Sequence, residues 1–525
     1  MAHRSRAGAL ALSVGAVMLS IASTPITAHA LVTTPLAFQN YPVAVGNTTY
    51  SAGEPSIGVN WQSGAVMVQS STHVIQAKFD DSAAPATVTM KDVTPVQSAT
   101  TLDPILFTDH FTGSAPNRTF SSNLLVACSL TTYTDTDGVP ASTAWTPSQG
   151  CGVHGAEDHQ SLGSGPYHAA VTKPPVNPAF PNAVYYCSQD FANGTAAFCS
   201  RSDDGALTYD NPVDIYTLQQ CGGLHGHIRV APDGTAYVPN QGCIPTAATA
   251  GSTSPVYTKQ TAVTSVDNGL TWTLNPVPDS RATAWSDPSV APGAQNTVYF
   301  GYENGGVDAS NVPSPTAAGG HPMIAVYHPV GSPGAGASPH WDASVDVGTP
   351  FNIQNTAFPE VIAGDDNRAA FAFLGTTTPG NDQDAAFAGV WYLYVSFTYD
   401  GGKTWTTVNA TPGDPVQRGC IWLAGGSNAC RNLLDFNDIA VDKLGRVVVV
   451  YADGCTGPCV TDPSKNKFEA VNVIARQSGG LGLFAASDPG NSAFVPETPS
   501  VAGLVLVVGA ALVIYDRRRR WFRRD

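Results

Sequence analysis

The chain has 525 residues, of which 51 are glycine and 40 are proline. Only 12% of the residues carry a charge, against about 25% in an average soluble protein. So many turn-forming residues exclude a mainly helical protein, a hydrophobic content of 43% excludes disorder, and a formal net charge of −15 excludes nucleic acid as a partner. These features indicate a mainly β, loop-rich protein that works outside the cell.

Residues 1–30 have the pattern of a signal peptide. A basic start with Arg4 and Arg6 precedes the apolar run 7–23, and Ala28 and Ala30 provide a small-x-small ending. We therefore expect this segment to be removed and the mature chain to be exported.

Seven repeat units follow along the body of the chain. In each unit a polar residue precedes a short apolar stretch, a turn and a β-rich run. Strand and turn signals alternate without helical periodicity, which is typical of propeller blades. The units begin at Glu54, Asp103, Asp158, His227, Asp287, Glu360 and Asp438. We predict an all-β fold in which residues 31–485 form a seven-bladed β-propeller, with residues 35–45 supplying a closing strand to the last blade.

The first residues of the units define a candidate site. In a propeller the innermost strands line the central funnel, so these residues are expected to converge at its mouth. Crowded carboxylates repel one another, which raises some pKa values or recruits a cation. The candidate catalytic residues are Glu54, Asp158, Asp287, Glu360 and Asp438. The alternative is that these carboxylates accept backbone N–H groups and merely cap loops. No cofactor is required, no metal ligands are assigned, and calcium is the cation we would expect if one is recruited.

A second motif, S/T-x-D-x-G-x-T-W, occurs at later turns of several units. Residues 265–272 and 398–405 are close copies, residues 202–209 are a looser one, and residues 135–138 with Trp145 form an interrupted fourth. Its hydroxyl and carboxylate groups can bond the backbone of the turn, glycine accepts a positive φ, and the aromatic ring packs between sheets. The residues expected to hold the fold are Asp204, Asp267, Gly269, Trp272, Asp400, Gly402 and Trp405. These copies resemble the Asp-box of sialidase-like (BNR-repeat) propellers, where the box lies away from the active site.

The resemblance implies a six-bladed propeller as the alternative fold, in which the unit at Asp103 merges into a neighbour. Sialidases clamp the substrate carboxylate with three arginines, the first in an F-R-I-P motif, and use a tyrosine nucleophile assisted by Glu together with an Asp acid. No F-R-I-P occurs in this chain, and residues 227–230, H-I-R-V, match it only poorly. The candidate substrate-binding residues are Arg118, His159, His227, Arg229 and Arg431. No tyrosine can be assigned as the nucleophile.

The ten cysteines form short sequential pairs, which in an exported chain predicts disulfides between neighbours. The pairs are Cys128 with Cys151, Cys187 with Cys199, Cys221 with Cys243, Cys420 with Cys430, and Cys455 with Cys459. A zinc site is the weaker alternative, because no C-x2-C pair occurs.

The C-terminus predicts an anchor. Residues 486–500 form a linker, residues 501–516 a hydrophobic segment and residues 517–525 a basic tail, which would remain in the cytoplasm. Together with the V-P-E-T-P stretch at 495–499, this segment resembles bacterial surface-sorting signals.

The sequence therefore favours an exported, surface-anchored, sialidase-like propeller that acts on or binds glycans or other extracellular polymers. As an enzyme it would be a glycoside hydrolase, exo-α-sialidase-like; the sequence leaves open whether it is catalytic. The alternative is a non-catalytic propeller for adhesion or protein binding. The expected partners are a carbohydrate or polymer and, through the tail, the membrane or cell wall.

Overall fold

A computed structural model describes residues 34–489 except 100, 102, 112, 126–127, 149–156, 170–179, 191–195, 223, 245–256, 284–285 and 306–318. The predicted signal peptide, the hydrophobic segment and the basic tail lie outside the described residues. Among the described residues, no helix is long and apolar enough to span a membrane.

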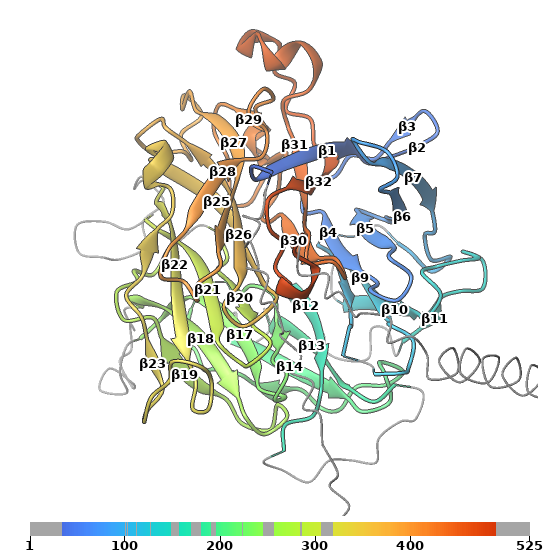
Figure 1. Cartoon of the computed structure of the whole chain (residues 1–525), viewed down its shortest axis with the longest axis vertical. Helices are drawn as coiled ribbons and strands as arrows, with labels where there is room; N and C mark the ends of the chain where they lie inside the picture. Colours follow the sequence, from blue (N-terminus) through green and yellow to red (C-terminus); the bar gives the residue numbers. More distant parts are fainter. Residues whose placement is uncertain are drawn as a thin grey trace, which may run out of the picture. The chain divides into compact units, whose positions relative to one another are not determined.

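Apart from one short hairpin, the described strands form seven antiparallel sheets, each a blade of a β-propeller (Figure 1). Blade 1 consists of β4 (Ser56–Val59), β5 (Val66–Ser70), β6 (His73–Asp80) and β7 (Thr87–Asp92). Blade 2 consists of β8 (Pro104–Thr108), β9 (Thr119–Leu125), β10 (Cys128–Thr134) and β11 (Thr146–Pro147). Blade 3 consists of β12 (Glu157–Gly165), β13 (Ala183–Asp190), β14 (Ala196–Ser202) and β15 (Val213–Asp214).

Three further blades complete most of the ring. Blade 4 consists of β16 (Arg229–Val230), β17 (Ala236–Cys243), β18 (Lys259–Ser265) and β19 (Thr273–Pro276). Blade 5 consists of β20 (Ser289–Pro292), β21 (Val298–Asn304) and β22 (His321–His328), which pairs with both β23 (His340–Trp341) and β24 (Val345–Asp346). Blade 6 consists of β25 (Asn355–Ala363), β26 (Ala369–Thr376) and β27 (Val390–Thr398), which pairs with both β28 (Thr406–Asn409) and β29 (Gln417–Arg418).

Blade 7 joins the two ends of the propeller. From the axis outward it consists of β30 (Asp438–Val441), β31 (Val447–Asp453), β32 (Val471–Gly479) and β1 (Ala37–Pro42). The N-terminal strand β1 pairs antiparallel with β32, as predicted, and Figure 1 shows the two side by side. The unit at Asp103 forms a blade of its own, so the seven-bladed prediction is confirmed and the six-bladed alternative is wrong.

The remaining elements are short. They are the hairpin β2 (Ala44–Val45) with β3 (Thr48–Thr49), and the 3-10 turns η3 (Thr349–Phe351), η4 (Ala429–Arg431), η5 (Gly457–Val460), η6 (Pro463–Lys465) and η7 (Ala485–Ser487). The last turn begins the predicted linker, and Asp488 just beyond it forms an ion pair of 2.7 Å with Arg368. The first residues of that linker are therefore attached to the propeller.

The innermost strands surround the axis in a closed ring, each contacting the innermost strands of both neighbouring blades. Residues from all seven line a narrow, mainly apolar channel of about 100 Å³. We call the face where these strands begin the funnel face. Because each blade alternates strand direction, the turn after its third strand lies on the opposite face.

The Asp-box turns occupy that opposite position, after β14, β18 and β27. In the box of blade 4, Asp267 accepts hydrogen bonds from the backbone N–H and the hydroxyl of Thr271, at 2.9 and 2.5 Å. The Ser265 hydroxyl accepts the N–H of Gly269 at 2.9 Å. The blade 6 box repeats this pattern with Thr398, Asp400 and Thr404.

Four of the five predicted disulfides are present in the described residues: Cys187–Cys199, Cys221–Cys243, Cys420–Cys430 and Cys455–Cys459. The fifth pair includes Cys151, which lies outside the described residues, and stays a prediction.

Candidate functional site

The seven predicted residues lie at the funnel face, within or up to two residues before the innermost strands. Asp438 begins β30, Asp158 is the second residue of β12, and Glu360 lies within β25. The other four, Glu54, Asp103, His227 and Asp287, precede β4, β8, β16 and β20 by one or two residues. We call these seven residues the funnel ring.

The backbone of the ring is irregular. Three residues that are not glycine have a positive φ: Glu54 (53°), His159 (48°) and Phe358 (57°). The pairing of β12 shifts between Asp158 and Ser161, and that of β25 shifts between Ala357 and Glu360. Bulges and left-handed residues are costly and are concentrated at functional sites, where they redirect side chains.

His159 connects carboxylates from three blades. Its Nδ1 lies 3.4 Å from Asp287 Oδ2, its Nε2 lies 3.7 Å from Asp158 Oδ2, and its backbone N–H donates to Asp103 Oδ2 at 3.1 Å. Burial alone would lower the pKa of His159, but the bond to Asp287 and the surrounding carboxylates raise it to about 10. The ring therefore holds a fixed imidazolium at neutral pH.

The pKa values of two carboxyl groups around His159 are raised as well, and here burial is the largest cause. Burial raises the pKa of Asp103 to about 6, although the positive charge of His159 acts to lower it. Burial also raises the pKa of Asp287, whose Oδ1 is buried without a hydrogen-bond partner among the described residues. An unpartnered buried oxygen of this kind is available to a ligand donor.

A second group joins Glu360 and Asp438 across blades 6 and 7. Glu360 Oε2 accepts the Ser289 hydroxyl at 2.9 Å, and Asp438 Oδ1 lies 3.5 Å from Arg229 Nη2. Burial, followed by the charge of Asp438, raises the pKa of Glu360 well above its usual value. Burial raises the pKa of Asp438 to about 6, although Arg229 acts to lower it. The shift favours the protonated form of Glu360, whereas the charge of Arg229 favours the ionised form of Asp438.

This group includes a set of atoms that could hold a cation. One ring nitrogen of His227 and one carboxylate oxygen each of Glu360 and Asp438 lie within 4.8 Å of one another. Burial lowers the pKa of His227 well below its usual value, so its imidazole is neutral and can act as a ligand. One imidazole nitrogen and two carboxylate oxygens fit a divalent transition metal better than they fit calcium, because calcium prefers ligands that are all oxygen.

Glu54 and Arg431 form the third group. Arg431 binds Asp435 with both arms of its guanidinium, at 2.6 Å each, and the backbone N–H of Asp435 donates to Glu54 Oε1 at 3.1 Å. Burial, then the charge of Asp103, raises the pKa of Glu54 well above its usual value. Arg431 lies at the ring, as predicted, but both arms of its guanidinium already bind Asp435, a residue that belongs to none of the sequence motifs.

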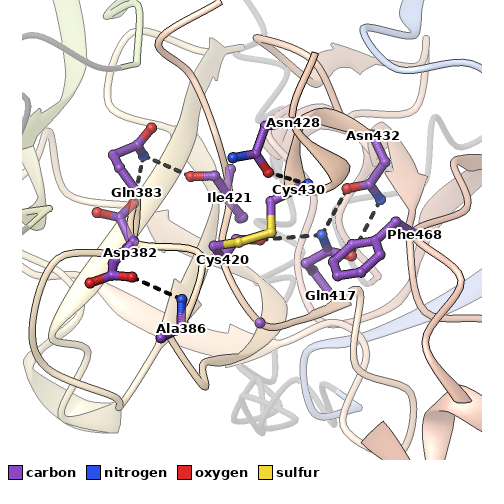
Figure 2. Close-up of a disulfide and its surroundings, with 12 residues drawn as sticks. Asp382, Gln383, Ala386, Gln417, Cys420, Ile421, Asn428, Cys430, Asn432 and Phe468 are labelled. Atoms are coloured by element: carbon purple, nitrogen blue, oxygen red, sulfur yellow. Dashed lines mark hydrogen bonds between the residues drawn. A yellow bond between two sulfur atoms is a disulfide. The ribbon is translucent and has the colours of Figure 1, made fainter. Parts of the chain in front are cut away.

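A disulfide holds the segment that carries Arg431. Cys430, the preceding residue, is bonded to Cys420, and Asn428 accepts the N–H of Cys430 at 2.9 Å (Figure 2). The Gln417 amide donates to Asn432 Oδ1 at 2.8 Å on the other side of the bond. The position of Arg431 is therefore fixed by covalent and polar contacts.

Arg118 lies elsewhere. It precedes β9, at the opposite face from the ring, and donates to both oxygens of Asp135 at 2.7 Å and to the Gly205 carbonyl at 2.7 Å. Its guanidinium also lies 3.8 Å from the centre of the Tyr133 ring. It joins blades 2 and 3, so of the three candidate arginines only Arg229 and Arg431 are near the ring.

The fold and the ring define a seven-bladed β-propeller with a charged site at one end of its axis. The sequence matches no family model and no curated protein. Solved structures that it resembles include a protein of unknown function from Dyadobacter fermentans, at 12% identity and a TM-score of 0.38 over 85% of this chain and 98% of that one. A Hadza microbial sialidase has 13% identity and a TM-score of 0.37 over 85% and 68%. The polysaccharide lyase Uly1 has 8% identity and a TM-score of 0.45 over 85% and 93%. Likenesses this distant carry no argument about function.

Proposed function

We propose that this protein is an exported, surface-anchored glycoside hydrolase that binds a carbohydrate chain at the funnel ring and cleaves it with Glu360 and Asp438. The single observation behind the proposal is this carboxyl pair. Cleavage of a glycosidic bond needs one carboxyl group that holds a proton and a second that is ionised. The raised pKa of Glu360 favours a carboxyl group that holds its proton, and Arg229 beside Asp438 favours the ionised form of that second group.

The spacing of the pair favours a retaining mechanism. Carboxyl groups in retaining enzymes are about 5–5.5 Å apart, against about 6.5–9.5 Å in inverting ones. The nearest oxygens of Glu360 and Asp438 lie within 4.8 Å of each other, which is below the separation found in inverting enzymes. Glu360 would protonate the leaving oxygen while Asp438 bonds the anomeric carbon. Water would then release the sugar, with Glu360 taking the water proton.

Other groups of the ring suit a polar ligand. Arg229 favours the ionised form of Asp438, and the His159 imidazolium, held by Asp287, is a second fixed positive charge in the ring. Three free arginines would be needed to clamp a substrate carboxylate in the sialidase manner. With Arg118 on the opposite face and Arg431 bound to Asp435, the ring favours glycosides other than sialosides.

Binding without turnover is the second candidate. Both oxygens of Asp438 accept backbone N–H groups, from Ile57 of blade 1 at 2.9 Å and from Ile439 at 2.8 Å. This is the arrangement expected if the carboxylate only fastens neighbouring blades. In that case the protein would hold glycans at the surface without cleaving them.

A screen of the purified protein against fluorogenic glycosides and polysaccharides, with and without chelator, tests the proposal. Glu360→Gln should reduce turnover by at least about a thousandfold, because the general acid is lost while the shape is kept. Asp267→Asn, in an Asp-box on the opposite face, is the control and should retain turnover. Full activity in Glu360→Gln would refute the assignment. Glycan binding without any turnover would support the second candidate.

A further inference from the structure

The turn between β22 and β23 of blade 5 differs from the corresponding turns of its neighbours. In blades 4 and 6 the third strand ends in an Asp-box, whose carboxylate holds the turn together. Blade 5 has no such motif. Its third strand ends at His328, and an eleven-residue connection leads to His340, Trp341 and Asp342.

Three metal-ligating side chains meet at the base of this connection. His328 Nε2 lies 3.1 Å from Asp342 Oδ2, and His340 Nε2 lies 3.7 Å from Asp342 Oδ1. One ligand atom from each of the three residues lies within 4.8 Å of the others. The His328 side chain is only 11% exposed, whereas those of His340 and Asp342 are 46% and 49% exposed. The His328 side chain is therefore held in place by its surroundings, whereas the side chains of His340 and Asp342 are free to move toward a metal ion.

The orientation of His328 directs its Nε2 toward this group. Its Nδ1 lies 2.7 Å from the Pro333 carbonyl oxygen, and a carbonyl only accepts, so Nδ1 is the donor of this hydrogen bond. Gly334 lets the loop approach, because a Cβ there would lie 2.9 Å from that nitrogen. His340 repeats the pattern more loosely, with Nδ1 3.4 Å from the Ser338 carbonyl oxygen. A backbone carbonyl on one ring nitrogen is how histidines are commonly oriented toward a metal on the other.

His328 Nε2 can meet the Asp342 carboxylate in two ways, through a proton of its own or through a cation that both groups bind. The available ligands are two imidazole nitrogens and one carboxylate oxygen. That set suits zinc and related transition metals, whose bonds to such ligands are about 2.0–2.2 Å long. Calcium prefers six to eight oxygens and does not match.

We propose that His328, His340 and Asp342 form a surface site for a divalent transition metal of the zinc type, with a fourth position open to water or another ligand. Bound there, the metal would close the β22–β23 connection in the place where an Asp-box closes the turn in blades 4 and 6. The site is separate from the funnel ring and does not depend on the proposed function.

Zinc binding to the full protein, stripped of metal by chelator and dialysis, tests the proposal. Calorimetric titration with ZnCl2 should show a site that His340→Ala and Asp342→Asn each weaken by at least tenfold, since even the loss of an outer-shell partner costs about 10- to 100-fold. Cobalt(II) should give the visible absorption of a four-coordinate ion in the wild type and lose it in both variants.

His321→Ala is the matched control. His321 lies at the other end of β22 and pairs with Asp346 at 3.0 Å with similar exposure, but neither belongs to a three-ligand group among the described residues. This variant should bind zinc as the wild type does. Unchanged binding in His340→Ala and Asp342→Asn, or no binding by the wild type, would overturn the proposal. The three side chains would then form only ion pairs. Loss of the same binding in His227→Ala alone would place the metal at the funnel ring and overturn it as well.

Discussion

Glu303 offers a direct test of how burial affects carboxyl groups near the funnel face. It lies in β21 and is 1% exposed; its Oε2 accepts the Ser286 N–H at 3.4 Å, and its Oε1 is buried without a partner among the described residues. Burial, followed by the charge of Asp382, raises the pKa of Glu303 to about 8. Because this pKa lies above the unfolded value, the carboxyl group contributes its full stability only below about pH 4.5 and loses it as the pH rises toward 8.

The magnitude follows from linkage. Each pH unit in that interval is worth about 1.4 kcal/mol per group, so Glu303 should reduce the free energy of unfolding by about 2–3 kcal/mol between pH 5 and pH 7. Glu303→Gln keeps an oxygen for Ser286 and removes the titration. With an unfolding entropy of about 2.1 cal/mol/K per residue, a domain of this size should gain about 2–3 °C in Tm relative to the wild type over that interval.

Differential scanning calorimetry of both proteins at pH 5 and pH 7 measures this gain. The comparison is between the variant and the wild type, because other buried carboxyl groups add pH dependence of the same sign to both. Asp233→Asn, an exposed carboxyl group, is the control and should show no pH-dependent gain. A Tm difference between Glu303→Gln and the wild type that stays constant from pH 5 to pH 7 would refute the reasoning.

Three further predictions concern the scaffold and the tail. Asp267→Ala should lower the free energy of unfolding by about 2 kcal/mol, since Thr271 loses a charged acceptor for two hydrogen bonds, and should leave ligand binding at the ring unchanged. Replacing Cys187 and Cys199 by alanine should lower the free energy of unfolding by about 3 kcal/mol, because the disulfide closes a separation of 12 residues. Denaturant titration measures the loss in the Asp267 variant and in the cysteine variant, and a variant that loses no stability would contradict the structural role given to its residues. Deleting residues 496–525 should release the protein into the medium; continued retention on cells would exclude the tail as the anchor.

The repeats made the blades predictable. Each blade is a local unit whose first strand follows a polar residue, so the beginning of each unit could be read along the chain. The neighbour disulfides were predictable for the same reason, as Cys187 and Cys199 lie directly opposite each other in adjacent strands.

The pairing of side chains across the ring was not predictable from local pattern. His159 and Asp287 meet because blades 3 and 5 close around one axis, and no feature of either unit encodes that meeting. No local sequence pattern indicated a hydrogen-bond partner for Arg118, because its partners Asp135 and Gly205 lie in turns that are distant from it along the chain. The spacing of Arg431 and Asp435, four residues apart, was the one local signal that could have shown that this arginine was occupied.

The closure of blade 7 by β1 has a consequence for how the protein is made. β1 is among the first segments to be synthesised, whereas its partner β32 follows more than 400 residues later. At about 5–20 residues per second, β1 waits for tens of seconds before its partner exists. During that time it is an unpaired edge strand able to pair with other chains. Synthesis of the whole propeller therefore has to finish before its ring can close, and a chain truncated before β32 should be captured by chaperones or proteases rather than accumulate as a six-bladed form.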